Sequence, residues 1–150
     1  MRMHLTRSWS RPIAAAALAV AGITGISACS SSEPANSSAS QAIGEHLAAS
    51  DFSAALKKPG TIVLDVRTPA EYANGHLPQA QNIDIEGPDF AARIAALDKN
   101  ATYAVYCHSG NRSGTALEQM AAASFTHTYD LAGGINAWQS MGGSMTTGSP

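Results

Sequence analysis

Residues 102–123 read TYAVYCHSGNRSGTALEQMAAA, and this stretch decides the fold class. Its first part, 102–107, is an apolar run of the kind found in strands buried on both faces. Its last part, 113–123, predicts a helix with Leu117 and Met120 facing inward. Between them lies a short loop with a glycine, so the stretch predicts a strand, a tight turn and a helix in succession.

The rest of the chain up to residue 147 continues this alternation, and no internal repeat is visible. Proline and glycine residues divide it into short segments. The further strands are expected at 61–66, 80–85 and 126–131, and the further helices within 46–56, 68–75, 88–97 and 134–141. Strands alternating with helices predict an α/β domain with a mostly parallel sheet, in which ligands bind at the carboxyl ends of the strands.

Two helix starts carry explicit capping signals. In the segment 46–56, an extended entry is expected to lead into a helix with Ser50 as its N-cap. The segment 68–75 has Thr68 as N-cap, proline at the first helical position, Glu71 three residues later and glycine at its end. The second pattern is a complete capping box and predicts a short helix.

The N-terminal residues 1–28 have the layout of an export signal. Three arginines precede the apolar run 13–26, and no acidic residue occurs before Glu33. The 14-residue run is shorter than the roughly 20 residues of a stable membrane span, so cleavage is expected, with an uncleaved anchor as the alternative. Residues 26–29, ISAC, resemble the lipobox of bacterial lipoproteins, which implies lipid modification of Cys29. The alternative is an ordinary signal peptide that has a cysteine near its cleavage site.

The sequence after the signal divides into a tether and a domain. Residues 29–42 are rich in serine and alanine and predict a lipidated N-terminus followed by a flexible tether, and residues 43–147 form the predicted domain. Without residues 1–28, six basic and eleven acidic residues remain, a formal net charge of −5. Nucleic acid is therefore not an expected partner. The expected location is extracytoplasmic, with a lipid anchor as the contact with the membrane.

Cys107 is then the one thiol left in an exported chain. It ends a predicted strand, and the backbone N–H groups of the following turn, together with the helix start and Arg112, are expected to favour a thiolate. A thiolate in this setting is a nucleophile. The alternative is that Cys107 is one more small buried apolar residue at a strand end.

Three motifs carry a resemblance to a known family. CHSGNRSG at 107–114 is similar to the active-site loop of rhodanese domains, DVRTPAEYANGHLPQAQNI at 65–83 resembles their first signature, and LAGGINAW at 131–138 resembles their C-terminal one. The resemblance implies a five-stranded parallel sheet flanked by helices on both faces. It also implies sulfur transfer through a cysteine persulfide, with no metal or organic cofactor.

Residue by residue, the resemblance makes Cys107 the nucleophile and sulfur carrier. It assigns the substrate cradle to five loop residues, which are His108, Ser109, Gly110, Asn111 and Arg112. Structural support near the site is expected from Asp65, Arg67, Glu71 and His76. Of these, Arg67 and Glu71 are four residues apart and could pair with each other, which favours a structural role for both. The implied partners are a small sulfane sulfur donor, a thiol or cyanide acceptor and, as a further candidate, a protein that accepts the sulfur.

Several alternatives stay open at this point. A carrier module would hold the persulfide with little turnover of its own. Cysteine-based phosphatases resemble C-x5-R, whereas Cys107 and Arg112 are spaced as C-x4-R, and the smaller ring favours sulfur transfer. His108 either adds charge and relays a proton or is merely solvated. Efficient thiosulfate-using relatives often have more than one cation at the loop, whereas here only Arg112 is permanently charged, so the donor is left open.

Overall fold

The computed structural model describes residues 43–150, and the predicted signal, Cys29 and the tether all lie outside the described residues. Its centre is a five-stranded sheet in the order β1-β5-β4-β2-β3, with every neighbouring pair parallel. The strands are β1 (Ile43–Leu47), β2 (Thr61–Asp65), β3 (Gln81–Asn82), β4 (Thr102–Tyr106) and β5 (His127–Leu131). The predicted α/β class with five parallel strands is confirmed.

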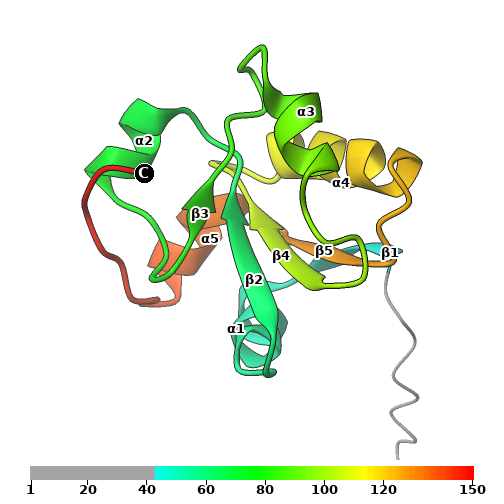
Figure 1. Ribbon diagram of the computed structural model, residues 1–150. Coiled ribbons are helices and arrows are strands. Elements are labelled where there is room, and N and C mark those ends of the chain that lie inside the picture. Colours follow the sequence, from blue (N-terminus) through cyan, green and yellow to red (C-terminus); the bar gives the residue numbers. More distant parts are fainter. Residues whose placement is uncertain (1–42) are drawn as a thin grey trace, which may run out of the picture. The chain divides into compact units, whose positions relative to one another are not determined.

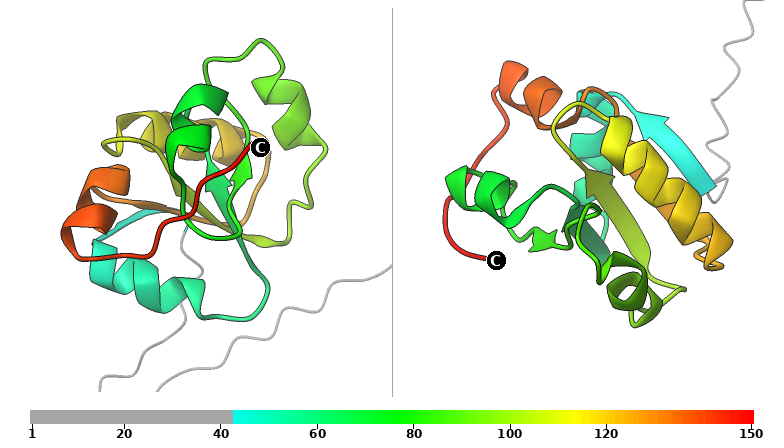
Figure 2. Two further views of the ribbon diagram at one scale, coloured as in Figure 1. Left: turned by 90° about the vertical axis from the view of Figure 1, so that its left-hand side faces the viewer. Right: turned by 90° about the horizontal axis from the view of Figure 1, so that it is seen from above.

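Helices cover both faces of this sheet (Figure 1). They are α1 (Ala49–Leu56), α2 (Pro69–Asn74), α3 (Phe90–Ala95), α4 (Asn111–Ala122) and α5 (Gly134–Ser140). Helices α1 and α5 pack on one face and α3 and α4 on the other, as the two turned views also show (Figure 2). No helix within residues 43–150 has the length and apolar character needed to cross a membrane.

The central strands explain why the sheet is parallel and covered on both sides. Neighbouring residues of β2 point to opposite faces, so that Val63 joins the core under α1 and α5 while Leu64 joins the core under α3 and α4. In β4, Val105 and Tyr106 divide in the same way, and both are fully buried. A strand without a solvent face needs helices on both sides, which right-handed crossovers between parallel strands supply.

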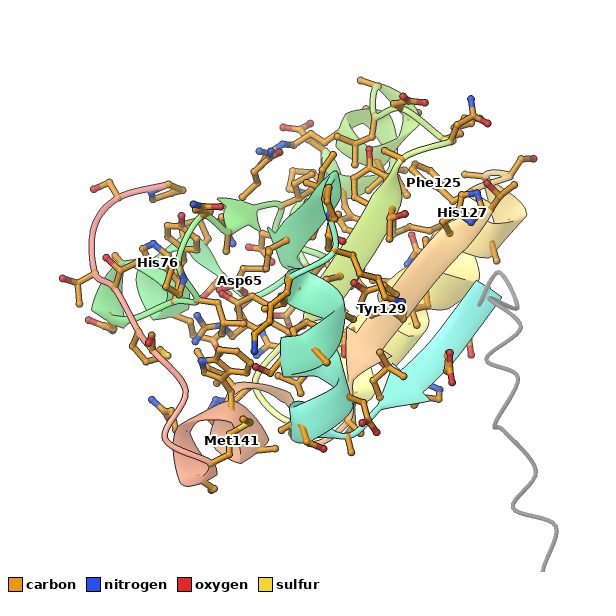
Figure 3. All side chains as sticks on the ribbon, turned by 90° about the horizontal axis from the view of Figure 1, so that it is seen from below. Asp65, His76, Phe125, His127, Tyr129 and Met141 are labelled. Carbon is orange, nitrogen blue, oxygen red and sulfur yellow. The ribbon has the colours of Figure 1, made fainter. Side chains whose placement is uncertain are left out.

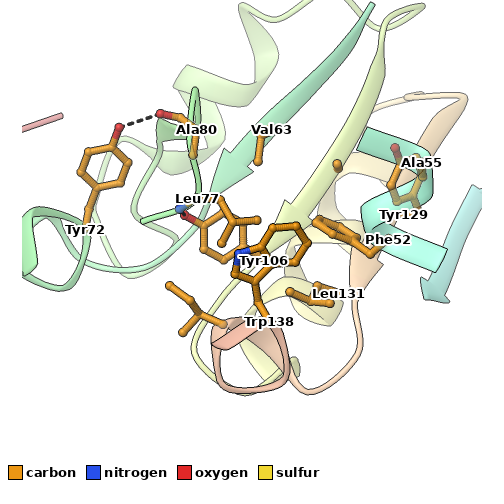
Figure 4. Packing of buried hydrophobic residues seen from close by; sticks show 12 residues of the cluster. Phe52, Ala55, Val63, Tyr72, Leu77, Ala80, Tyr106, Tyr129, Leu131 and Trp138 are labelled. Carbon is orange, nitrogen blue, oxygen red and sulfur yellow. Dashed lines mark hydrogen bonds between the residues drawn. The ribbon is translucent and has the colours of Figure 1, made fainter. Parts of the chain in front are cut away.

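The core under α1 and α5 is rich in aromatic side chains (Figure 4). Phe52 packs edge-to-face against Tyr129 and Trp138, with ring centroids 5.8 and 6.3 Å apart. On the opposite face, Met120 of α4 is fully buried. The inward position predicted for Met120 is therefore confirmed, and Trp138 is also buried.

Some element boundaries differ from the prediction. Helix α1 begins at Ala49 with Ala48 as its N-cap, so the expectation for Ser50 was wrong; Ser50 lies inside the helix. Strand β3 is only two residues long because a turn at 84–87 ends the regular pairing, although Ile83 and Ile85 still donate backbone hydrogen bonds to the chain at the end of β2. The predicted capping box of α2 is present in full, with Thr68 and Glu71 bonding reciprocally.

The carboxyl ends of the strands form one edge of the sheet. Asp65 ends β2 at this edge, whereas His127 begins β5 at the opposite edge, and the two side chains lie far apart in Figure 3. Asp65 of β2 is paired with Tyr106, the last residue of β4, and Cys107 follows Tyr106 in the chain. Cys107 therefore lies close to Asp65 at this edge. The two sequence motifs that begin at these residues are thus neighbours in space.

Candidate active site

Cys107 lies at the point where β4 gives way to α4. Its thiol is free and its side chain is fully buried. The backbone N–H of Gly110 donates to Sγ, with an N to Sγ distance of 3.1 Å. Gly110 is also the N-cap of α4 and has a φ of 100°, a conformation that glycine adopts without strain. The sulfur therefore sits at the N-terminal end of a twelve-residue helix, where negative charge is stabilised.

The loop is held from the other side by the start of α5. Ile135 N–H donates to the Cys107 carbonyl at 2.8 Å, and Asn136 N–H donates to the His108 carbonyl at 3.4 Å. A Cβ at Gly134 would lie 2.6 Å from both of these carbonyl oxygens. Only glycine allows this close approach, which is what the second of the two consecutive glycines in the motif 131–138 provides.

Arg112 binds two carboxylates that come from distant parts of the chain. Its two terminal nitrogens donate to the two carboxylate oxygens of Glu71, each at 2.8 Å, and Nη1 also donates to Glu86 at 3.1 Å. Hydrogen bonds from Arg112 lower the pKa of Glu71 to about 2, and those with Glu71 raise the pKa of Arg112. The pairing of Arg67 with Glu71 that their spacing allowed is not formed, because Arg112 reaches Glu71 across 41 residues of sequence.

Arg67 instead pairs with Asp65 in the interior. Its Nε and Nη2 donate to the two carboxylate oxygens, the shortest distance being 2.6 Å, and Nη2 also donates to the Gly75 carbonyl at 2.7 Å. The Tyr106 hydroxyl donates to the same carboxylate at 2.6 Å. Burial opposes the charge of Arg67, but the hydrogen bonds and the charge of Asp65 outweigh it and raise the pKa of Arg67. The pair joins the end of β2 to the end of α2.

His76 fixes the chain that follows α2. Its Nδ1 lies 2.9 Å from the Tyr72 carbonyl, and its ring stacks on the Tyr72 ring at a centroid distance of 3.6 Å. Its backbone pairs with Thr146 in an antiparallel bridge with both hydrogen bonds formed, at 2.9 and 2.8 Å. His76 therefore ties the C-terminal segment to α2.

A second buried carboxylate near the loop was missed by the sequence reasoning. Asp130 of β5 accepts from the Ser113 hydroxyl at 2.6 Å and lies 2.6 Å from His46 Nδ1. Ser113 also lies 3.0 Å from the Gly110 carbonyl, so a chain of contacts leads from His46 to the residue that donates to Sγ. The available signal was an aspartate inside the predicted strand 126–131, since a carboxylate in a buried strand needs a partner.

A pocket of about 530 Å³ lies beside the loop. His108 is the loop residue that lines it. Arg67 lines it from the segment between β2 and α2, and Glu71 lines it from α2. The remaining lining comes from α2, α5 and the C-terminal segment, namely Asn74, Gly75, Ile135, Gln139 and residues 145–147. Cys107 is not part of this lining. The pocket is thus a neighbour of the sulfur cradle and not the cradle itself.

The family of the chain follows from comparison with known domains. The model of the rhodanese-like domain family matches residues 48–141, more than half of the chain. The chain belongs to this family. It is 36% identical over 87 residues to a thiosulfate sulfurtransferase GlpE of Pseudomonas fluorescens, covering 57% of this chain and 77% of that protein. It is 33% identical over 86 residues to the GlpE of Stutzerimonas stutzeri, covering 57% and 76%.

Solved structures agree with this membership. A rhodanese-related protein from Thermoplasma volcanium superposes with a TM-score of 0.62 at 30% identity, covering 69% of this chain and 99% of that one. A rhodanese-like domain protein from Staphylococcus aureus has a TM-score of 0.57 at 25% identity, covering 63% and 90%. Both structures therefore agree with the rhodanese-like family in fold and in sequence.

In this rhodanese-like domain, the predicted site residues fall into separate groups. The loop residues and Glu71 meet at the carboxyl edge beside Cys107, whereas Asp65, Arg67 and His76 stabilise β2, α2 and the chain after them. Gly110 is the loop residue whose backbone bonds to Sγ in the part of the chain that the structure describes. His108, Ser109 and Asn111 are exposed. Within residues 43–150 no group of three or more potential ligands is placed to hold a metal ion.

Proposed function

We propose that this protein transfers a sulfane sulfur through a persulfide on Cys107. The Cys107 thiolate attacks the outer sulfur of the donor, the S–S bond of the donor breaks, and the leaving group departs with the electron pair. A nucleophilic acceptor such as cyanide or a thiol then attacks the terminal sulfur, and the Cys107 thiolate is released. The two displacements balance without an added oxidant or reductant and lead to ping-pong kinetics.

One observation carries this proposal. The sulfur of Cys107 lies at the N-terminus of α4 and accepts a hydrogen bond from Gly110, which supports negative charge on the thiolate and on the persulfide alike. The names of the relatives support the same chemistry, since they are thiosulfate sulfurtransferases. The C-x4-R loop favours it over a phosphatase.

Intact mass spectrometry tests the proposal directly. Purified protein incubated with a sulfane donor should gain the mass of one sulfur atom and lose it again when cyanide is added. The Cys107→Ser variant is the matched control and should gain nothing. If the wild-type protein gains no sulfur from any donor, or hydrolyses aryl phosphates in a Cys107-dependent manner, sulfur transfer is not its function.

A carrier role is the second candidate. It is favoured by Arg112, whose charge is already taken up by Glu71 and Glu86, so that the loop attracts an anionic substrate weakly. A carrier would form the persulfide stoichiometrically, turn over slowly with small acceptors, and pass sulfur to a protein that co-purifies with it. Fast turnover with cyanide or a small thiol would favour the enzyme instead.

The N-terminal sequence motivates a further proposal about location. Residues 1–28 act as a lipoprotein signal, Cys29 becomes the lipidated N-terminus, and the rhodanese-like domain is held outside the cytoplasm by a tether. Intact mass of the membrane-extracted protein should show a lipid at Cys29 and the loss of 28 residues. A Cys29→Ser variant that is still cleaved after residue 28 and still membrane-bound, as is expected of the wild type, would contradict lipidation at Cys29.

A further inference from the structure

Three charged side chains meet beside the active-site loop. Arg112 donates to both oxygens of Glu71 and to one oxygen of Glu86, at 2.8, 2.8 and 3.1 Å. One positive and two negative charges leave this group with a net charge of −1. The other permanent cation near the loop, Arg67, is neutralised by Asp65. The loop arginine therefore presents no surplus positive charge to a substrate.

Glu86 contributes charge to this group and little to the structure. Its side chain is 62% exposed, compared with 31% for Glu71. Glu71 also completes the capping box of α2, whereas Glu86 lies in the turn before α3. In the described part of the chain the side chain of Glu86 has no hydrogen bond other than that with Arg112, and its backbone N–H donates to Asp84. Removing the charge of Glu86 would leave the two-fold bond between Arg112 and Glu71 intact.

The neighbouring pocket is large for an inorganic sulfur anion. Its volume of about 530 Å³ falls in the range that holds organic ligands. The side chains that line it away from the loop carry no net charge and include both polar and apolar groups, namely Asn74, Ile135, Gln139, Met145, Thr146 and Thr147. Such a surface suits an organic group better than a small dianion.

We propose that the sulfur donor is a small organic persulfide whose carbon-bearing part occupies this pocket, and that Glu86 is a specificity-determining residue that disfavours the dianion thiosulfate. This inference rests on the proposed sulfur transfer. In the step itself, the Cys107 thiolate attacks the terminal sulfur of the persulfide. The donor S–S bond breaks, and the organic thiolate leaves with the electron pair.

The first test changes the charge at the loop. Glu86→Gln removes one negative charge, and Asp98→Asn makes the same change at the opposite edge of the sheet, before β4. Values of kcat/KM are measured with thiosulfate and with cysteine persulfide as donors and cyanide as acceptor. Glu86→Gln should raise the value for thiosulfate roughly three- to ten-fold and that for cysteine persulfide less than two-fold, because Coulomb repulsion scales with donor charge. Asp98→Asn should change neither.

The second test narrows the pocket. Thr147 is exposed, lines the pocket and makes no side-chain hydrogen bond in the described part of the chain, so Thr147→Trp should fill space without disturbing the fold. The fold is checked by thermal unfolding, in which Thr147→Trp should have the same midpoint temperature as the wild type. This variant should raise KM for cysteine persulfide several-fold and KM for thiosulfate less. The persulfide is thus the more affected donor here, whereas thiosulfate is the more affected donor in Glu86→Gln.

The outcomes separate this inference from the proposed function. If both donors respond equally to Glu86→Gln, or thiosulfate does not respond, Glu86 does not determine specificity. If Thr147→Trp affects thiosulfate as much as the persulfide, the pocket does not hold the organic part. In either case Cys107 would still gain one sulfur by mass. If it gains none from either donor, the proposed function itself fails.

Discussion

Two arginines of this protein bind carboxylates in the same two-fold geometry but in opposite surroundings. In the pair of Arg67 with Asp65, the side chains are 5% and 0% exposed, and in the pair of Arg112 with Glu71 they are 26% and 31% exposed. The first pair also receives the Tyr106 hydroxyl, whereas the second shares its arginine with Glu86 at the surface. The two ion pairs therefore share their hydrogen-bond geometry but differ in their exposure to water.

The difference shows how burial decides what an ion pair does. A charge that is removed from water depends on its partner, so breaking the interior pair leaves an expensive unpaired group. An ion pair in contact with water contributes little to stability, and the pair of Arg112 with Glu71 lies beside the active-site loop, where its net charge acts on an approaching substrate. The inner pair should determine whether the carboxyl edge folds, and the outer pair should determine what the loop accepts.

The largest expected effect comes from breaking the inner pair. Asp65→Asn keeps the shape of the side chain but leaves Arg67 buried without a countercharge, so the free energy of unfolding should fall by about 3–5 kcal/mol. Urea denaturation measures this value. Asp98→Asn, a change of the same kind at an exposed residue, should stay within about 0.5 kcal/mol. Equal effects in the two variants would show that burial does not distinguish the inner pair.

The carboxylate of Asp130 provides an intermediate case. Its partners are Ser113, which is buried, and His46, whose side chain is 62% exposed. Ser113→Ala removes one of two side-chain partners of a buried carboxylate and should cost about 1–3 kcal/mol in urea denaturation. Thr115→Ala, at an exposed hydroxyl of the same helix, is the control. If Ser113→Ala lowers the free energy of unfolding no more than Thr115→Ala does, water replaces the Ser113 hydroxyl at Asp130.

The outer pair should matter more for activity than for stability. Arg112→Gln should lower the free energy of unfolding by about 1 kcal/mol or less, because the pair is partly exposed. It should lower kcat/KM for sulfur transfer at least roughly ten-fold, because the loop loses its cation and Glu71 keeps its negative charge without an arginine partner. Both values are measured on the same preparation. Destabilisation as large as that of Asp65→Asn would remove the distinction between the two pairs.

The smallest expected effect is an acid dependence of stability at Glu71. The pKa of Glu71 is about 2 in the folded protein and 4.5 ordinarily, so the pair stabilises fully above pH 4.5 and this contribution is lost as the pH falls towards 2. The difference in unfolding free energy between the wild type and Glu71→Gln should therefore shrink over this range. A difference that is constant from pH 7 to pH 2 would mean that the charge of Glu71 contributes nothing.

Local patterns in the sequence were sufficient for much of the fold. The capping box of α2 depends on residues three positions apart and is present as predicted. The uninterrupted apolar runs of β2 and β4 predicted strands covered on both faces, which the burial of Leu64 and Val105 confirms. Ser50 shows the limit of such reasoning, because the helix begins at Ala49 without a side-chain cap. Packing of the apolar face of α1 decides where that helix starts.

The candidate site also has features that local sequence predicts and features that it does not. The order of strand, loop and helix around Cys107 predicted a sulfur at a helix N-terminus, because those neighbours are adjacent in the chain. The partners of Arg112, in contrast, are 41 and 26 residues away, and His46 and Asp130 are 84 residues apart. Such contacts depend on the order of strands in the sheet, which places β1 beside β5 and β2 beside β4.

The sequence by itself thus determined the fold class, the capping of α2 and the place of Cys107, because each depends on periodicity or on residues close together in the chain. The tertiary structure alone decided that Arg112 binds Glu71 and Glu86, that Arg67 binds Asp65, and that residues 145–147 line a pocket beside the loop. The physical reason is that a charged side chain takes the partner that the packed sheet brings within reach, not the one nearest in sequence.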